Sequence, residues 1–306
     1  MNVLRLIRLY INRLIILKNA VQFDVIWVEK EIFPWIPYFI EQRLFPPNVP
    51  IIVDYDDAIF HRYDQSSNGI IRYIFSNKID QVMRAADIVI TGNDYLKVWA
   101  EKAGARRVIH LPTVVDLKRY SPKYPNGNIE QTVVGWVGSP ITAKYLESLG
   151  DIISSLSDSK NIQFVAIGAN HTQFNKLPIE KKEWSVKCEV SEIQKFDIGI
   201  MPIPDEPFER GKCAYKIIQY MACGIPVVAS PVGMNSKVVK QGINGFLAST
   251  NREWASAIKE LSSNPSLRKK LGDNGRNMVE EQYCLDKTAP ILKGVLTGMI
   301  ERKIKT

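Results

Sequence analysis

The chain has 306 residues, of which 45% are hydrophobic and 24% are charged. These proportions are those of an ordinary globular protein, and they exclude a long disordered or low-complexity chain. Because this length exceeds what one core usually serves, we expect two domains. The formal net charge of +8 indicates an anionic partner such as phosphate or an acidic membrane surface, and no nucleic-acid-binding motif accompanies it.

Cysteine and histidine usage limits the chemistry. The chain has four cysteines and three histidines, and none of them stands at the spacing of a zinc site or a CxxC pair. We therefore expect free thiols in a reducing compartment, hence a cytoplasmic protein, and no metal site. No run of about 18 apolar residues occurs, so no transmembrane helix is expected.

The first 20 residues carry a basic amphipathic pattern. Apolar residues recur there at helical spacing among cations: Leu4, Ile7, Ile11, Leu14 and Ile15 with Arg5, Arg8, Arg13 and Lys18. The segment lacks a small-residue cleavage site, so it fits a signal peptide poorly. Two interpretations remain open. Residues 1–20 either lie on an anionic membrane face as a peripheral helix, or they pack on the core with their arginines in solvent.

Buried, β-branched runs alternate with helical patterns along the whole chain, which predicts parallel sheets covered by helices. Strands are expected at residues 24–28, 50–53, 87–91, 107–111, 132–137, 162–167, 198–201 and 226–229. Helices are expected at residues 80–86, 94–103, 141–149, 212–223, 254–262, 266–271, 275–282 and within 286–306. The stretch from Tyr120 to Asn128 is rich in Pro, Gly and Asn and predicts an interdomain linker. The fold class is therefore α/β with two Rossmann-like domains, which bind ligands beyond the carboxyl ends of their strands.

The first candidate site runs from Gly135 to Thr142, where a strand end meets the expected start of a helix. Ser139 suits the N-cap and Pro140 the first helical position. Gly138 would let the backbone approach a ligand, and the free N–H groups of a helix N-terminus favour phosphate. Capped helices after strands are common, so this motif is weak by itself.

A stronger signal lies between Phe196 and Gly233. A buried strand closed by prolines leads to Arg-Gly-Lys at residues 210–212, which opens an expected helix. Cations at a helix N-terminus oppose its dipole, and a bound polyanion would resolve that conflict. Lys212, Lys216 and Gln219 stand at i, i+4 and i+7, so one face would carry two cations and an amide. The alternative is a surface helix with solvated lysines.

The order and spacing of these residues resemble the donor-binding half of retaining glycosyltransferases of family four, which have the two-Rossmann GT-B fold. The matching pieces are Asp197–Pro202, Arg210–Cys213, Lys216–Gly233 and Gly242–Phe246. Weaker matches at Val53–Phe60, Leu111–Asp116 and Gly135–Pro140 extend the resemblance over most of the chain. The resemblance implies a nucleotide-diphosphate sugar as donor, retention at the anomeric carbon, and no required metal or other cofactor. It also implies a glycan or a lipid-linked acceptor.

The resemblance makes Arg210, Lys212 and Lys216 the candidates for binding the diphosphate. Transfer leaves a nucleoside diphosphate whose negative charge grows in the transition state, and fixed cations aimed at that charge would stabilise it. Arg210 is the best suited of the three, because its guanidinium can bind phosphate through two parallel hydrogen bonds.

The family often has two glutamates eight positions apart around the donor. In this chain Gln219 stands at the second, ribose-binding position and Gly211 at the first, so nearby Glu209 is the candidate substitute for the missing carboxylate. An amide can still hydrogen-bond a ribose. The predicted donor contacts are therefore Gly138, Ser139, Thr142, Glu209, Arg210, Gly211, Lys212, Lys216 and Gln219.

Asp54, Asp56 and Asp57 end a strand of the first half, at a position that suits an interdomain cleft. Related enzymes often hold a His-Asp pair near this strand end; Asp54 takes roughly that place, and His61 follows in the next loop. Paired carboxylates would bind acceptor hydroxyls or help to remove a proton, so the three aspartates are the catalytic candidates. A metal site and capping of the next helix are the alternatives.

The resemblance assigns residues 1–122 to an acceptor-side domain, residues 130–285 to a nucleotide-sugar-binding domain, and residues 286–306 to a helix that packs back toward the first. Full-length relatives have more βα units before the equivalent of Phe23–Val28, so the first domain is expected to be abbreviated. The chain would then be a fragment, would be completed by a partner chain, or would be a non-catalytic sugar-nucleotide-binding subunit. We expect a glycosyltransferase; that subunit, or an epimerase of similar fold, is the alternative.

Overall fold

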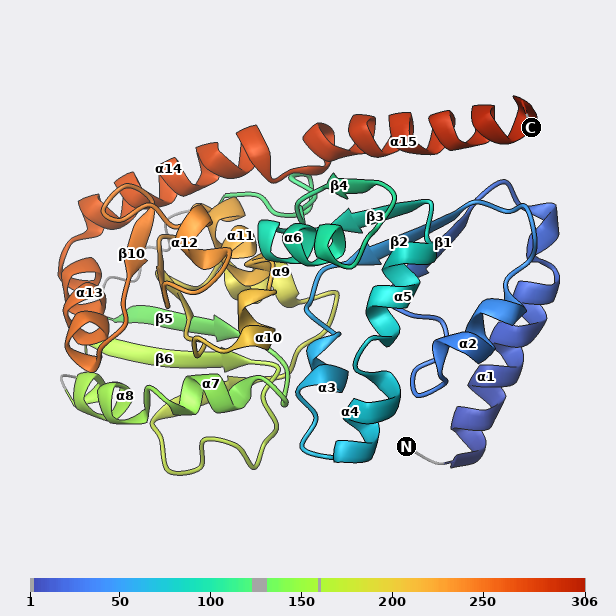
Figure 1. The fold of residues 1–306 in the computed structure, drawn as a ribbon. Coiled ribbons are helices and arrows are strands. Elements are labelled where there is room, and N and C mark those ends of the chain that lie inside the picture. Colours follow the sequence, from blue (N-terminus) through green and yellow to red (C-terminus); the bar gives the residue numbers. More distant parts are fainter. Residues whose placement is uncertain (1–2, 123–130, 159–160, 306) are drawn as a thin grey trace. The chain divides into compact units, whose positions relative to one another are not determined.

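The computed structural model describes residues 3–122, 131–158 and 161–305. The chain divides into two compact units, each built on a parallel sheet, which confirms the predicted α/β class (Figure 1). Unit 1 contains Met1–Pro112, Arg210–Cys213 and Thr288–Thr306, and unit 2 contains Thr113–Glu209 and Ala214–Lys287.

Unit 1 has a four-stranded parallel sheet in the order β1-β2-β3-β4. These strands are Ile26–Glu29, Ile51–Tyr55, Ile88–Thr91 and Val108–His110, each within three residues of its predicted bounds. Its helices are α1 (Val3–Lys18), η1 (Ala20–Gln22), α2 (Tyr38–Glu41), η2 (Gln42–Leu44), α3 (His61–Asp64), α4 (Gly69–Phe75), α5 (Lys78–Ala85), α6 (Asp94–Lys102) and, from Thr288 on, α15 (Leu285–Lys305).

The two faces of this sheet pack against different helices, because successive side chains of a strand point to opposite sides. Ile52, Ile88 and Ile90 form one core cluster with Val295 and Met299 of α15. The alternate strand residues pack into a second cluster with residues of α5 and α6, namely Val53, Tyr55 and Val89 with Ile79, Val82, Met83, Leu96 and Ala100. The sheet is therefore buried on both sides, as its near-continuous apolar strands require.

Unit 2 has a six-stranded parallel sheet in the order β10-β9-β8-β5-β6-β7. Its strands are β5 (Thr132–Val137), β6 (Ile162–Ile167), β7 (Ile179–Lys182), β8 (Ile198–Met201), β9 (Val227–Ala229) and β10 (Gly245–Leu247). Its helices are α7 (Ala143–Glu147), α8 (Gly150–Ser157), α9 (Glu189–Ile193), α10 (Pro207–Arg210, whose last residue groups with unit 1), α11 (Tyr215–Ala222), α12 (Asn235–Val238), α13 (Asn251–Ser263) and α14 (Pro265–Gln282). One core lies under α7, α8 and α13, and the other under α11, α12 and α14 (Figure 1).

The junction of β5 and β8 depends on two glycines that face each other in register, Gly135 and Gly199. A Cβ on Gly135 would meet the Phe196 ring at 2.1 Å, and one on Gly199 would meet the Tyr220 ring at 2.4 Å. The bare backbone therefore makes room for two rings, whose centroids are 6.1 Å apart. The Tyr220 hydroxyl accepts a hydrogen bond from the Val137 N–H at 2.8 Å, which holds the end of β5.

Two predicted boundaries are wrong. The predicted linker begins at Tyr120, but this residue is buried in the core of unit 2 and donates a hydrogen bond from its hydroxyl to Glu189 at 2.7 Å. Val115 also forms a parallel bridge with Cys284, so the chain passes to unit 2 after Pro112 and not after residue 122. Residues 123–128 of the predicted linker lie outside the described residues.

The predicted helices at 266–271 and 275–282 are one continuous helix, α14. The break expected between these two helices is absent, and Gly272 and Gly275 serve close packing. A Cβ on Gly272 would lie 2.0 Å from the carbonyl oxygen of Gly224, and one on Gly275 would lie 2.9 Å from the Met221 side chain. Conversely, the predicted helix at 141–149 ends at Glu147, and α8 begins at Gly150.

Replacing Gly199 by alanine tests the β5–β8 junction. The new methyl group would lie against the buried Tyr220 ring, so we expect G199A to lose about 1–3 kcal/mol of unfolding free energy, as overpacked cores do. A Cβ on Gly294 of α15 would meet no atom within 4 Å, so G294A should be neutral or more stable by up to about 1 kcal/mol. Urea unfolding measures both. Equal stability of the two variants would contradict this account of the junction.

Candidate functional site

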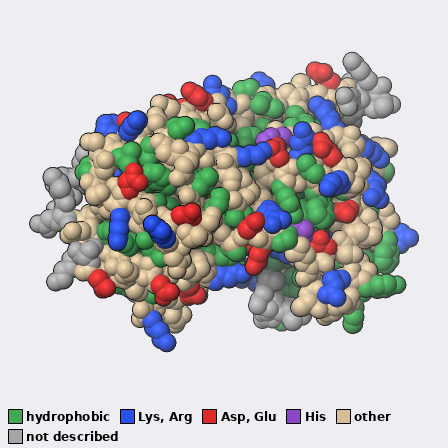
Figure 2. All heavy atoms as spheres, turned by 60° about the vertical axis from the view of Figure 1, so that its left-hand side comes forward, with side chains coloured by type: hydrophobic (Ala, Val, Ile, Leu, Met, Phe, Trp, Pro, Cys, Tyr) green, Lys and Arg blue, Asp and Glu red, His purple; other side chains and the backbone are tan. Residues whose placement is uncertain are grey.

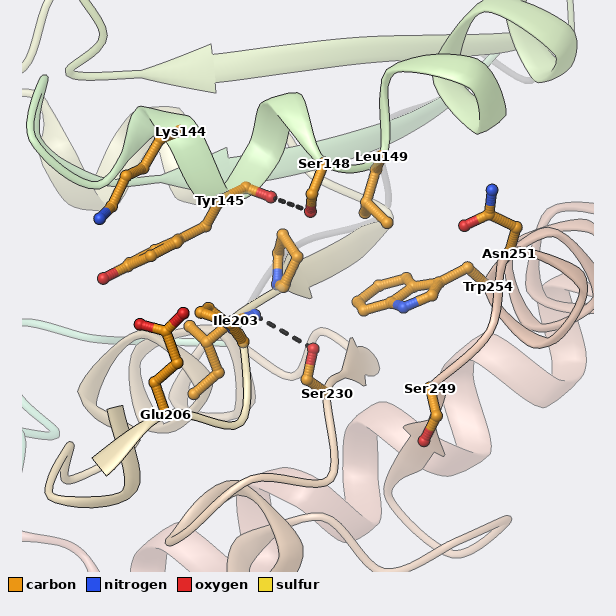
Figure 3. A pocket seen from close by; sticks show the side chains of 12 residues that line it. Lys144, Tyr145, Ser148, Leu149, Ile203, Glu206, Ser230, Ser249, Asn251 and Trp254 are labelled. Carbon is orange, nitrogen blue, oxygen red and sulfur yellow. Dashed lines mark hydrogen bonds between the residues drawn. The ribbon is translucent and has the colours of Figure 1, made fainter. Parts of the chain in front are cut away.

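A pocket in unit 2 lies where the strand order of the sheet changes direction. From β5 the chain proceeds to β6 and β7 on one side, and β8, β9 and β10 follow on the other. Ligands of doubly wound sheets bind outside the carboxyl ends of the strands at such a switch point. A cavity of about 470 Å³ opens there (Figure 3). Its lining comes entirely from segments that follow the carboxyl ends of β5, β8, β9 and β10: Lys144, Tyr145, Ser148, Leu149, Pro202, Ile203, Pro204, Glu206, Ser230, Ser249, Asn251 and Trp254.

The pocket has two chemically different ends. Figure 3 shows the ammonium group of Lys144 and the carboxylate of Glu206 at one end, and Trp254 and Asn251 at the other. Between them the Ile203 N–H donates a 3.0 Å hydrogen bond to the Ser230 hydroxyl, which fixes the loop that follows β8. Apolar walls with a few polar groups are typical of sites for small organic ligands.

Tyr145 connects this pocket to Glu209. Its hydroxyl donates a hydrogen bond to the Glu209 carboxylate, and the side chain of Glu209 is buried. Lys144 lies over the ring of Tyr145, with its ammonium 5.2 Å from the ring centroid. Glu209 was predicted to contact the donor. It does not line the cavity itself, but it holds Tyr145, which does.

The predicted phosphate site at residues 138–142 needs correction. Ser139 was expected to cap a helix, but α7 begins at Ala143 and has only five residues. The segment before it is a turn in which two N–H groups already have partners: that of Ser139 donates to the Thr142 hydroxyl at 2.9 Å, and that of Thr142 to the Ser139 carbonyl at 3.0 Å. Position 138 needs a glycine for packing within the protein, because a Cβ there would meet the Trp136 ring at 2.0 Å.

The predicted cationic face of the next helix is also wrong. Ala214 has a left-handed backbone (φ 56°) and caps α11, which begins at Tyr215. Lys212 therefore lies outside the helix, and the spacing of Lys212, Lys216 and Gln219 does not place them on one face. Lys216 alone stays in the first turn of α11.

Gln219 belongs to a buried polar network of unit 2. Its amide donates to the Tyr120 hydroxyl at 2.7 Å, and Glu189 accepts hydrogen bonds from Tyr120, Arg119 and Trp184 at 2.7, 3.0 and 2.9 Å. Burial and the Glu189 hydrogen bond raise the pKa of Tyr120. The predicted ribose-binding amide thus has an internal partner in this structure.

The aspartates predicted as catalytic form a cluster in unit 1 at the end of β2. Lys30 forms ion pairs with Asp56 at 2.7 Å and with Asp57 at 3.8 Å. Asp54 lies beside them, and burial, with smaller contributions from Asp56 and Glu29, raises the pKa of its carboxyl to about 6. A carboxyl with that pKa exchanges protons near neutral pH, as a general base must.

Residues 210–213 pack against this cluster within unit 1. The Asn93 amide donates to the Gly211 carbonyl at 2.8 Å, and the Cys213 thiol donates to the Asp56 carbonyl at 3.1 Å. Lys212 lies 3.8 Å from Asp57. A Cβ on Gly211 would meet the Ala58 Cβ at 2.4 Å, so this position has no room for a carboxylate side chain.

A polar relay follows in the same unit. The imidazole of His61 is buried, with Nδ1 2.9 Å from Asp64 and Nε2 2.7 Å from the Tyr95 hydroxyl. Burial raises the pKa of Tyr95, and the positive charge of Arg210 acts against that rise. The structure thus brings Arg210, Gly211 and Lys212, predicted as donor contacts, into the unit that holds the catalytic candidates.

Sequence reasoning missed Lys144, Tyr145 and the pocket that they line. The available signal was their position in the first segment after the carboxyl end of β5. Within the described residues, no group of three or more His, Cys, Asp or Glu side chains has the arrangement of a metal site. In the same part of the chain, no helix combines the length and the apolar character needed to cross a membrane. All four cysteines are free thiols.

Asn imitates the protonated form of Asp54 and so tests its raised pKa. Because the folded protein holds this proton up to about pH 6 and the unfolded chain releases it near pH 3.8, ionisation of Asp54 destabilises the fold as pH rises from about 4 to 6. D54N should therefore match wild type at pH 4 and be more stable by about 2 kcal/mol at pH 7.5.

Urea unfolding at both pH values measures this difference. Asp273→Asn is the control, because Asp273 is exposed and its ion pair with Lys269 (2.8 Å) lies on the surface of α14. That substitution should show no comparable change between the two pH values. A stability difference of D54N that is the same at pH 4 and pH 7.5 would contradict a perturbed Asp54.

The two parallel sheets with a pocket at the switch point define the class of a doubly wound α/β protein with two Rossmann-like units. A family comparison is more specific. The chain belongs to the family "Glycosyl transferases group 1", whose model matches residues 125–278.

Curated relatives match shorter segments. An uncharacterized glycosyltransferase of Methanocaldococcus jannaschii is 30% identical over 95 residues, which is 30% of this chain and 24% of the relative. A D-inositol 3-phosphate glycosyltransferase of Actinosynnema mirum is 37% identical over 59 residues, 19% of this chain and 14% of the relative. The matches thus span a quarter or less of the length of these relatives.

Solved structures share the fold over nearly the whole chain. Sucrose-phosphate synthase from Thermosynechococcus elongatus superposes with a TM-score of 0.73 at 16% identity, covering 93% of this chain and 76% of that one. HepE of Anabaena, in complex with UDP and glucose, gives a TM-score of 0.73 at 16% identity, covering 93% and 80%. The fold is therefore that of GT-B glycosyltransferases, as predicted.

Proposed function

We propose that this glycosyltransferase moves a sugar from a nucleoside-diphosphate sugar to a hydroxyl of a glycan or lipid-linked acceptor, with retention and without a required metal. The observation that carries the proposal is the switch-point pocket of unit 2, with the Lys144 ammonium at one end and apolar walls along it. A nucleoside diphosphate complements both features, because its diphosphate is anionic and its base is a flat ring. HepE of Anabaena has been solved in complex with UDP and glucose and with UDP-glucose, which makes a UDP-sugar the first donor to test.

Lys144 is the proposed diphosphate-binding residue. In the reaction, the bond between the anomeric carbon and the diphosphate oxygen breaks, and the electron pair leaves with the diphosphate. A new bond forms from the acceptor oxygen to the anomeric carbon, and the acceptor proton passes to a base. An ammonium group at the diphosphate stabilises the charge that grows there, in the role that a metal ion has in other transferases.

The cluster of unit 1 is proposed to serve the acceptor. Asp56 and Asp57 are charge-balanced by Lys30 and Lys212, whereas burial leaves Asp54 with a pKa near 6. Ionised Asp54 can accept a proton from an acceptor hydroxyl at neutral pH. Because protonation removes this base, activity should fall as the pH drops through about 6. Groups other than Asp54 would determine how activity changes at high pH.

Donor binding is tested with UDP-, GDP-, ADP- and dTDP-sugars, by thermal unfolding and calorimetry. One nucleotide should stabilise wild type, and Lys144→Ala should weaken its binding about tenfold or more, because a charge-assisted contact is lost. Lys259→Ala is the matched control: Lys259 is exposed on α13 and does not line the pocket. Equal binding by the K144A and K259A variants would refute this donor site.

Turnover separates the enzyme from a binding subunit. The crowding of Gly211 by Ala58 supports the alternative of a non-catalytic nucleotide-sugar-binding protein, because the family carboxylate has no room there. Donor hydrolysis or transfer in the presence of EDTA, lost in D54N, would support the metal-independent enzyme. Binding of donor without any turnover, with all acceptors offered, would support the subunit.

A further inference from the structure

Helix α1 has an outward stripe of large apolar side chains. Ile7, Ile11 and Ile15, spaced by four residues, are 50%, 50% and 53% exposed. A helix that only covered a core would bury such residues and expose polar ones. The stripe is not needed to attach the helix, because another face does so.

The attachment of α1 to unit 1 uses Tyr10, Arg13 and Leu17. Leu17 is buried, and the Tyr10 ring packs on Phe33 with their centroids 5.6 Å apart. The Tyr10 hydroxyl donates to the Pro34 carbonyl, and the Arg13 guanidinium donates to the Ile32 carbonyl. This inner face holds the helix in place and leaves the stripe of Ile7, Ile11 and Ile15 toward solvent.

The charges of α1 have one sign. Arg5, Arg8, Arg13 and Lys18 lie on the helix, all exposed, and its sequence contains no acidic residue. On the face drawn in Figure 2, by contrast, acidic and basic side chains are interspersed. An apolar stripe flanked only by long cationic side chains is complementary to an anionic bilayer, because their stems can cover apolar surface while the charges reach the phosphates.

From these observations we infer that α1 is an interfacial helix that docks unit 1 on an anionic membrane surface. The Ile7, Ile11 and Ile15 side chains insert among the acyl chains near the headgroups, and Arg5, Arg8 and Lys18 contact lipid phosphates. The helix lies in the plane of the surface and does not cross it. Docking at a bilayer is independent of donor binding in unit 2, and it would favour acceptors presented by lipids.

The inference is tested by co-sedimentation of the full chain with vesicles of phosphatidylcholine alone or mixed equally with phosphatidylglycerol. We expect binding to the anionic vesicles only, weakened by salt. Arg5→Gln with Arg8→Gln should lower the partition coefficient roughly tenfold or more. Ile7→Glu with Ile11→Glu should abolish binding, with donor binding and thermal unfolding like those of wild type.

Ile70→Glu is the matched control, because Ile70 is 70% exposed on α4 of the same unit. It should leave vesicle binding unchanged. Failure of wild type to bind either vesicle overturns the inference, and so does binding that neither double variant reduces. If wild type instead self-associates and I7E/I11E is monomeric, without vesicle binding, the stripe contacts a second copy and the membrane assignment is wrong.

Discussion

The contact of Tyr220 with the β5–β8 junction is the constraint on which the arrangement of unit 2 depends. Gly135 and Gly199 leave the backbone bare where these strands pair; the Phe196 ring lies against Gly135, and the Tyr220 ring lies against Gly199. The Tyr220 hydroxyl accepts a 2.8 Å hydrogen bond from the Val137 N–H, which links the end of β5 to α11. The segment that follows β5 carries Lys144, and its position in the pocket follows from that anchor.

In unit 1, burial and ion pairing act in opposite directions on the aspartates at the end of β2. Three aspartates stand within four residues at the end of β2, and their mutual repulsion is offset by Lys30 and Lys212. The compensation is uneven: Asp56 has an ion pair at 2.7 Å, whereas burial dominates at Asp54. Uneven compensation is how neighbouring carboxyl groups come to have different pKa values and different roles.

Much of the fold could be predicted because buried parallel strands are continuous apolar runs. The bounds of β5, β6 and β8 agree with their predicted ranges. The errors arise where a residue has two possible functions. Glycine is common in turns, but at position 272 its lack of a side chain lets α14 approach Gly224. That contact can be recognised only in the folded structure.

The candidate site was less predictable, because it depends on backbone conformation and tertiary contact. Nothing in the composition around Ala214 reveals its left-handed conformation (φ 56°), so Lys212 was assigned to a helix that begins three residues later. No local motif marks Lys144, and only the strand order shows that it lines a pocket with the residues that follow β8. That Asp54, Asp56 and Asp57 cluster at a strand end could be predicted, because their spacing and their position after a strand are local features.

Hydrogen exchange of the full chain with and without a UDP-sugar tests the central claim most directly, that the donor binds at the switch point of unit 2. The account predicts slower exchange in peptides covering residues 138–149 and 201–206, the segments that follow β5 and β8, and loss of that protection in the K144A variant. Protection confined to other segments, with these two unchanged at a saturating donor concentration, would contradict it.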